Sequence, residues 1–170
     1  MEKVSASSLL DRFWNGVLPI NPEAIAEALG IRVVPLSQQD VLKGLSGALH
    51  WHPSEDGEGH QLFCRFNQNE SKERQRFTIA HELGHFASGH LAGNRVMFRD
   101  TNEMFTKRVF DPLEAEANRF AAALLMPADL VKASIQRDGM TTLHQLAKRF
   151  GVSESAMRWR LVNLGLLSSR

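Results

Sequence analysis

The pattern of apolar and polar positions predicts one helix and three strands in the N-terminal part of the chain. Residues 21–30 start with an asparagine and a proline and end at a glycine, which is the pattern of a short capped helix. The runs 31–36, 44–52 and 60–67 are rich in apolar and β-branched residues and are typical of strands. Because the segment 53–59 is rich in turn-forming residues, we expect the last two strands to form a hairpin.

The strand at 60–67 has two distinct faces. The alternating positions are Leu62, Cys64 and Phe66 on one face and Phe63, Arg65 and Asn67 on the other. We therefore expect one buried face and one partly exposed face. We also place this strand at an edge of the sheet, where an extended substrate could add as a further strand.

A long helix follows, with apolar residues on more than one side. Asn67 and Glu70 have the spacing of a capping box, so the helix is predicted to begin just after Asn67 and to end near Gly89. The apolar positions are Ile79, Leu83 and Phe86 on one stripe and Phe77, Ala80 and Gly84 on a neighbouring face. This pattern indicates a helix buried among other elements.

Within this helix, His81, Glu82 and His85 form the H-E-x-x-H (HExxH) pattern of helical zinc sites. A spacing of four puts both imidazoles on one face, where they can reach one ion. Glu82 is rotated by about 100° from His81, so it can flank a metal without binding it. The alternative is a pair of core histidines beside a solvated glutamate. Burying these polar groups in an apolar helix is costly without a partner, which a metal would provide.

A catalytic zinc needs a third protein ligand, and the same helix does not obviously offer one. One class of zinc peptidases has a third histidine ten residues after the first, but that position is Leu91 here. On a continuous helix His90 would point away from the metal. We therefore expect His90 to cap the helix end or to lie at the rim of the site.

A second helix, predicted at 111–126, supplies a matching carboxylate. Glu114 and Asn118 are four residues apart, which suits a ligand carboxylate and an amide that orients a histidine ligand. Two alternatives stay open at this point. Glu114 could close a capping box with Asp111, and Glu116 is a competing carboxylate that we expect to face solvent.

These segments resemble the ImmA/IrrE family of zinc-dependent metallopeptidases. The resemblance rests on RQRFTIAHELGHF at 74–86, EAEANRFAAALLMP at 114–127 and LAKRFGVSESAMRWRLVNLGLL at 146–167. The resemblance implies that the metal is Zn²⁺, that its ligands are His81, His85 and Glu114, and that Glu82 is the general base. Because the ligand types constrain the metal only loosely, Mn²⁺ could take its place.

The resemblance also implies a fold and a function. The fold we expect is α+β and zincin-like, with a small antiparallel or mixed sheet packed on the HExxH helix. The function is that of a metalloendopeptidase that cleaves a helix-turn-helix transcriptional repressor, as in stress-response, mobile-element or toxin–antitoxin systems. The alternative is a non-proteolytic, metal-containing regulator or toxin–antitoxin component that binds DNA or protein. An uncoordinated Glu82 favours the peptidase, because a structural metal usually has four protein ligands.

The C-terminal region, 131–170, is predicted to form a helix-turn-helix-like unit integrated with a peptidase core at 1–130. Residues 132–170 carry seven basic and two acidic residues, so their net charge is +5, whereas that of the whole chain is +1. The small core predicted for this unit consists of Leu146, Phe150, Val152, Met157 and Leu161. The excess of positive charge is a feature of proteins that bind nucleic acid.

Three side chains of the last helix, Arg158, Trp159 and Arg160, could face DNA. We prefer the interpretation that this unit braces the core or binds a protein partner, with Trp159 and Phe150 as packing residues. In that interpretation the basic residues form a docking surface for the repressor.

The cysteine content and the lack of signal-like or membrane-like segments indicate where the protein is found. A single cysteine, Cys64, allows no internal disulfide, and no segment is typical of a secretory signal or a membrane span. We therefore expect a cytoplasmic protein with no membrane partner.

The chain has no tyrosine, so the oxyanion would be stabilised by a histidine, an arginine, a backbone N–H or the metal alone. The candidate histidines are His50, His52, His60 and His90.

Overall fold

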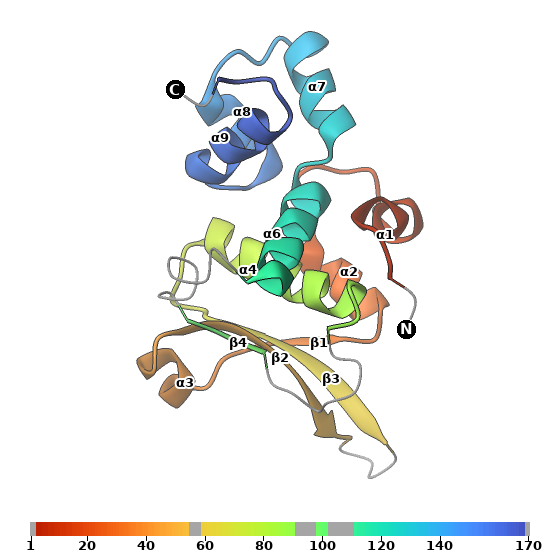
Figure 1. Cartoon of the computed structure of the whole chain (residues 1–170), viewed down its shortest axis with the longest axis vertical. Coiled ribbons are helices and arrows are strands. Elements are labelled where there is room, and N and C mark those ends of the chain that lie inside the picture. The colour runs from red at the N-terminus through yellow and green to blue at the C-terminus, as the bar shows by residue number, and fades with distance from the viewer. Residues whose placement is uncertain (1–2, 55–58, 91–97, 102–110, 169–170) are drawn as a thin grey trace.

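The chain has an α+β fold in which most of the helices lie on one face of a four-stranded sheet (Figure 1). The computed structural model describes residues 3–54, 59–90, 98–101 and 111–168. The helices in these ranges are α1 (Ala6–Phe13), α2 (Pro22–Ala28), α3 (Gln38–Leu42), α4 (Lys72–Ala87), α6 (Pro112–Leu125), α7 (Ala128–Gln136), α8 (Leu143–Phe150) and α9 (Glu154–Asn163). The strands are β1 (Arg32–Pro35), β2 (Leu45–Pro53), β3 (His60–Phe66) and β4 (Phe98–Thr101). The predicted α+β class is confirmed.

The sheet is mixed, with the strand order β1-β3-β2-β4. Strands β2 and β3 form the predicted antiparallel hairpin, in which Leu49 is opposite Cys64. Strand β1 pairs with β3 in parallel, and β4 pairs with β2 antiparallel. The prediction that residues 60–67 lie at a sheet edge is wrong, because β1 and β2 flank β3. A parallel neighbour arrives through a crossover connection, which the pattern within a strand does not reveal.

Side-chain caps fix the start of two helices as the sequence predicts. The Asn21 side chain accepts the backbone N–H of Glu23 at 3.1 Å, directly before α2. The Asp111 side chain accepts the backbone N–H of Leu113 at 2.9 Å, directly before α6. Each helix has a proline in its first turn, where the missing N–H costs nothing.

The central helix α4 begins later than predicted, because its N-cap is Ser71. The capping box proposed for Asn67 and Glu70 is wrong, since both side chains bond to strand β2. The Asn67 amide donates to the carbonyl of Leu45 at 3.3 Å, and Glu70 accepts the hydroxyl of Ser46 at 2.9 Å. The two residues therefore tie the loop before the helix to the sheet.

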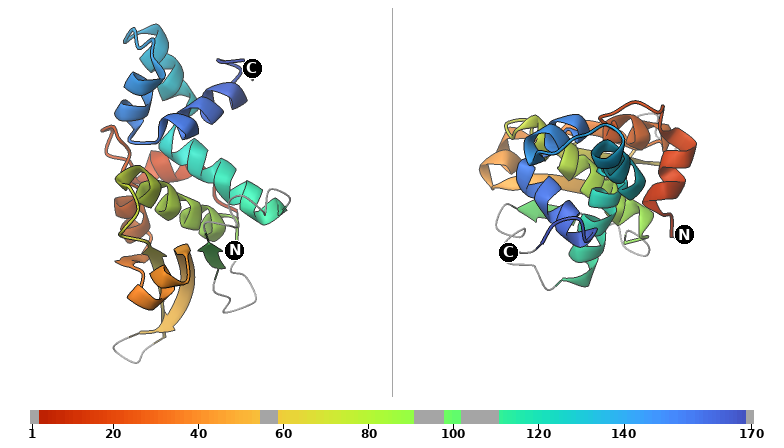
Figure 2. Two further views of the ribbon diagram at one scale, coloured as in Figure 1. Left: turned by 90° about the vertical axis from the view of Figure 1, so that its left-hand side faces the viewer. Right: turned by 90° about the horizontal axis from the view of Figure 1, so that it is seen from above.

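Helix α4 lies between α6 and the sheet (Figures 1 and 2), and a glycine at each of these two contacts allows close packing. A Cβ at Gly84 would lie 2.9 Å from Cα of Ala117, so α4 and α6 cross almost backbone to backbone. A Cβ at Gly47 of β2 would lie 2.4 Å from Cγ2 of Thr78, so the sheet approaches α4 equally closely. The prediction of a helix buried on more than one side is confirmed.

The helices α8 and α9 lie at the end of the molecule opposite the sheet (Figure 2). Gly151 joins them in the left-handed conformation, with φ of 61°, and Ser153 caps α9. The predicted small core is confirmed, because its five residues are all buried: Leu146, Phe150, Val152, Met157 and Leu161. Among the helices of the described ranges, none has both the length and the apolar character of a membrane span.

Two arginines attach this helix pair to the rest of the chain. Arg76 of α4 donates from Nε to the carbonyl of Gly151 at 3.0 Å, and Arg160 of α9 donates from Nε to the carbonyl of Met126 at 2.9 Å. Arg160 is therefore a partly buried brace and does not face outward as suggested. Trp159 is 68% exposed, so its assignment as a packing residue is wrong, whereas Phe150 is fully buried.

Candidate metal centre

Two helices bring a cluster of possible metal ligands together. His81 and His85 lie one turn apart on α4, and Glu114 reaches them from the first turn of α6. Their ligand atoms all lie within 4.8 Å of one another. The two Nε2 atoms are 3.0 Å apart, and the Glu114 carboxylate oxygens lie 3.2 Å from Nε2 of His81 and 3.6 Å from that of His85.

The donor set of this cluster fits a divalent cation. Both imidazoles are fully buried, and Glu114 is 8% exposed. Burial raises the pKa of Glu114, but the hydrogen bonds with His81 and His85 outweigh this effect and hold its pKa well below the ordinary value. Two imidazole nitrogens and an ionised carboxylate are the ligands that zinc commonly binds. The carboxylate of Glu114 therefore contacts the two histidines and does not form a capping box with Asp111.

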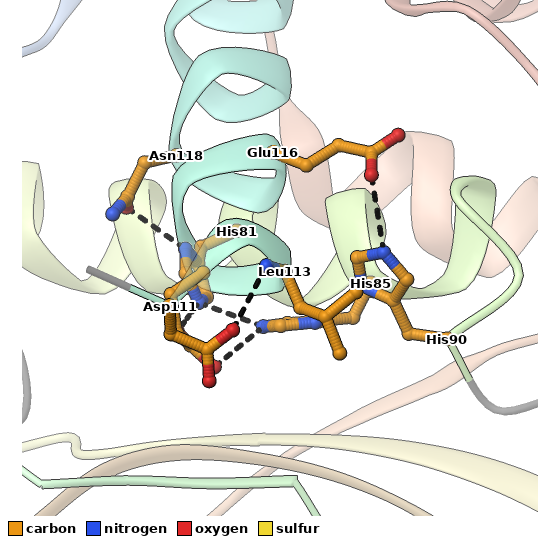
Figure 3. Close-up of polar contacts among 8 residues, drawn as sticks. His81, His85, His90, Asp111, Leu113, Glu116 and Asn118 are labelled. Carbon is orange, nitrogen blue, oxygen red and sulfur yellow. Dashed lines mark hydrogen bonds and ion pairs between the residues drawn. The ribbon is translucent and has the colours of Figure 1, made fainter. Parts of the chain in front are cut away.

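Each histidine contacts a second side chain through its other ring nitrogen (Figure 3). Nδ1 of His81 lies 3.0 Å from Oδ1 of Asn118, one turn beyond Glu114 on α6, as the spacing predicts. Nδ1 of His85 lies 2.9 Å from Nδ1 of His90. Such contacts fix the orientation of an imidazole and the nitrogen that carries its proton.

His90 reaches His85 because α4 ends before it. The helix stops at Ala87, and Gly89 has a positive φ of 73°, so the chain reverses instead of continuing. The backbone N–H of His90 then bonds to the carbonyl of His85 at 3.0 Å, which agrees with the prediction that His90 caps the helix end. The prediction that its side chain points away from the site is wrong, since it assumed a continuous helix.

Glu116 lies on the other side of α6 from the cluster. Its carboxylate is about one third exposed, and it pairs with Lys3 at 2.9 Å and with Nε2 of His90 at 3.4 Å. The Lys3 ammonium is the main reason why the pKa of Glu116 is lowered. The expectation of a solvent-facing carboxylate therefore holds in part.

Glu82 lies on the sheet side of α4 and is fully buried, so the alternative of a solvated glutamate is wrong. A Cβ placed on Gly47 would lie 2.7 Å from Oε1 of Glu82, so this carboxylate rests against the backbone of β2. Burial raises the pKa of the Cys64 thiol, and the charge of Glu82 raises it further. Cys64 is thus a fully buried residue of the core.

The sheet separates two of the candidate oxyanion histidines from α4. Side chains alternate along β2, and Gly47 faces α4, so His50 and His52 face the opposite side. There both rings contact Phe63, with centroids 5.9 Å and 6.0 Å away. His60 is exposed at the start of β3. Among the described candidates, His90 alone contacts the cluster.

Sequence reasoning gave Gly47 no role at this site, and it placed Gly89 and His90 at the helix end without finding the contact between His90 and His85. Gly47 is a glycine inside a strand, and such a glycine often marks the close approach of another element. Gly89 and His90 follow the last apolar position of α4, where a glycine commonly ends a helix and turns the chain. Both signals were present in the sequence, but the partner that each residue meets depends on tertiary packing.

A buried cluster of two histidines and a glutamate is typical of a metalloprotein. The chain belongs to the IrrE N-terminal-like domain family of peptidases, whose family model matches residues 26–162. The family resemblance noted from the sequence is thereby confirmed.

Three similar proteins carry names of metallopeptidases. The radiation response metalloprotease IrrE of Deinococcus radiodurans is 38% identical over 92 residues, which cover 52% of this chain and 27% of that protein. The protein of the same name from Deinococcus deserti is 36% identical over 109 residues, covering 62% and 37%. The metallopeptidase ImmA of Bacillus subtilis is 29% identical over 102 residues, covering 60% and 57%. The matches thus span less than two thirds of each relative's length.

Proposed function

We propose that this chain is a zinc-dependent metallopeptidase with His81, His85 and Glu114 as metal ligands and Glu82 as the general base. The observation that carries this proposal is the convergence of three ligand side chains from α4 and α6 within 4.8 Å, with Glu82 buried between α4 and the sheet. Membership of a peptidase family supports it. Manganese could replace zinc, because nitrogen and oxygen ligands accept both metals.

The residues around the cluster suit peptide hydrolysis. A zinc held by three protein ligands keeps an open position and supplies Lewis acidity for water and for the scissile carbonyl. Glu82 would accept a proton from the attacking water and return it to the leaving amine. Asn118 would keep His81 oriented through its Nδ1 atom.

An extended substrate could bind by adding to the sheet. In the described ranges the edge strands are β1 and β4, and β4 is the one that pairs with β2, the strand whose Gly47 lies against Glu82. Backbone hydrogen bonds along such an edge give affinity with little side-chain selectivity. We therefore place the substrate segment at β4, in place of the β3 edge expected from the sequence.

The substrate we propose is a helix-turn-helix repressor, as the ImmA/IrrE resemblance implies, cut in the cytoplasm. The test is to incubate the zinc-loaded protein with the helix-turn-helix repressor encoded nearest to its gene and, separately, with casein. We expect one or very few cuts in the repressor, none in casein, and no cutting when a chelator is present. Cutting of casein as fast as the repressor would contradict the selectivity, and chelator-resistant cutting would contradict the metal mechanism.

The alternative of a non-proteolytic regulator is less well supported. A structural metal usually has four protein ligands and needs no buried carboxylate beside the first histidine. The described residues contribute three ligand side chains and place Glu82 directly after His81. This arrangement favours a site that performs chemistry.

A further inference from the structure

At the C-terminal end of α4, the backbone conformation brings His90 into contact with His85. The N–H of His90 bonds to the carbonyl of His85, and the N–H of Gly89 bonds to the carbonyl of Phe86 at 3.1 Å. With Gly89 at a positive φ, these two bonds form a Schellman motif, which commonly brings the residue after the glycine into contact with the third-last helical residue. Here that contact joins two imidazoles, whose ring centroids are 5.1 Å apart.

The contact continues to the surface through charged side chains. Nε2 of His90 lies 3.4 Å from Oε2 of Glu116, and Oε1 of the same carboxylate lies 2.9 Å from Nζ of Lys3. The N-terminal segment is held in place next to Lys3, because the N–H of Val4 bonds to the carbonyl of Ala87 at 2.9 Å. A continuous chain of contacts therefore runs from His85 to the N-terminal segment.

The directions of these hydrogen bonds follow if Nε2 of His85 is the atom that binds the metal. His85 turns Nε2 toward His81 and Glu114, so a metal there would take the Nε2 lone pair and leave the proton on Nδ1. Nδ1–H of His85 would then donate to Nδ1 of His90, which must accept. The proton of His90 is thereby placed on Nε2, where it can donate to Glu116. Every member of the chain has a compatible partner.

We propose that His90 and Glu116 are positioning residues for the metal site, with His90 acting on His85 directly and Glu116 acting through His90. The proposal rests on the proposed assignment of His85 as a metal ligand. Residues that orient a ligand histidine contribute roughly 10–100-fold to metal affinity in other metalloproteins. Lys3 contributes little, because an ion pair at an exposed position is screened by water.

The experiment measures zinc affinity by competition with a chelator and does not depend on activity. His90→Phe keeps a ring but removes both nitrogens, and we expect it to weaken zinc binding by roughly 10–100-fold. His90→Gln restores an acceptor and a donor and should recover part of the loss. Glu116→Ala, which removes the acceptor of the His90 Nε2–H, should weaken binding less, and adding it to His90→Phe should cause no further loss. Lys3→Ala should change the affinity by less than about fivefold.

The matched control is His144→Phe, which removes another histidine paired with a glutamate, 2.9 Å from Glu154, outside the cluster. It should bind zinc like the wild type. Wild-type affinity in folded His90→Phe and Glu116→Ala would overturn the proposal, as would additive losses in the double variant. Glu116→Ala leaves the helix end of α4 intact, so its zinc affinity is the deciding measurement if His90→Phe does not fold. If His81→Ala and Glu114→Ala both still bind zinc, the proposed metal site itself is wrong.

Discussion

Two glutamates of α6 are two positions apart and have different surroundings, and this difference is the reason why we propose Glu114 as the metal ligand. Glu114 is buried against His81 and His85, whereas Glu116 pairs with Lys3 and His90 near the surface. The spacing of residues placed Glu114 on the face of α6 that meets the two histidines, because both helices are regular over the residues concerned.

We predict that Glu114→Ala loses its stoichiometric zinc, whereas Glu116→Ala still holds about one zinc per chain when zinc is in excess. The reason is that Glu114 offers an oxygen to the ion, while Glu116 can act only through His90. Metal analysis of the two purified variants after removal of free zinc measures this. If Glu116→Ala is the variant without zinc, the ligand assignment is wrong.

The contact between His85 and His90 shows what spacing rules leave out. The positions of His81, His85, Glu114 and Asn118 could be predicted, because each pair lies within one regular helix. The position of His90 could not, since it depends on the residue at which α4 stops and on the conformation of Gly89. Whether Glu82 was buried or solvated also depended on the distance between α4 and β2.

At the scale of elements, the separation between β2 and α4 depends on Gly47. A methyl group there would lie 2.4 Å from Cγ2 of Thr78 and 2.7 Å from Oε1 of Glu82, which is far closer than real Cβ contacts. Either β2 and α4 separate or the Glu82 side chain moves. Both changes would disturb the carboxylate that we propose as the general base.

We predict that Gly47→Ala lowers the free energy of unfolding by about 1–3 kcal/mol, as overpacking of a core does, and lowers peptidase activity at least tenfold. Zinc content should be unchanged, since the ligands come from α4 and α6. Adding Thr78→Ser removes the nearest methyl group and should restore stability more than activity, because the conflict with Glu82 remains. Full activity in the single variant would show that Gly47 does not position Glu82.

The arrangement of strands was the least predictable feature of the fold. The hairpin of β2 and β3 follows from two apolar runs with a turn between them, and it was predicted with nearly correct ends. The parallel addition of β1 and the pairing of β4 with β2 join segments that are distant in the sequence. A strand such as β3, with one buried face, can occupy either an edge or an interior position.

At the scale of the whole molecule, the C-terminal helices lie far from the sheet and are tied on by Arg76 and Arg160. Their core was predictable from periodicity, but the outward side of α9 was not. Arg160 bonds to the end of α6, and Arg158 and Trp159 are the exposed residues beside it. The boundary at residue 130 and the helix-turn-helix-like role stay predictions.

We predict that Arg158→Glu and Trp159→Ala slow cleavage of a helix-turn-helix repressor severalfold and leave cleavage of a short peptide spanning the cut site unchanged. The reason is that exposed tryptophan and arginine residues are typical of interaction surfaces. The comparison is made by initial rates on the two substrates. An equal loss on both would indicate a structural brace. Loss of binding to duplex DNA, with both rates unchanged, would favour DNA binding instead.

The measurement that tests the central claim most directly compares the wild type with Glu82→Gln, both loaded with zinc, on the same repressor. The amide cannot accept a proton from water, but it preserves the size of the side chain beside Gly47. We expect Glu82→Gln to hold about one zinc per chain, to unfold at the temperature of the wild type or above it, and to leave the repressor intact when mass spectrometry shows the wild-type cut. Cleavage by zinc-loaded Glu82→Gln at the wild-type rate would contradict the proposed mechanism.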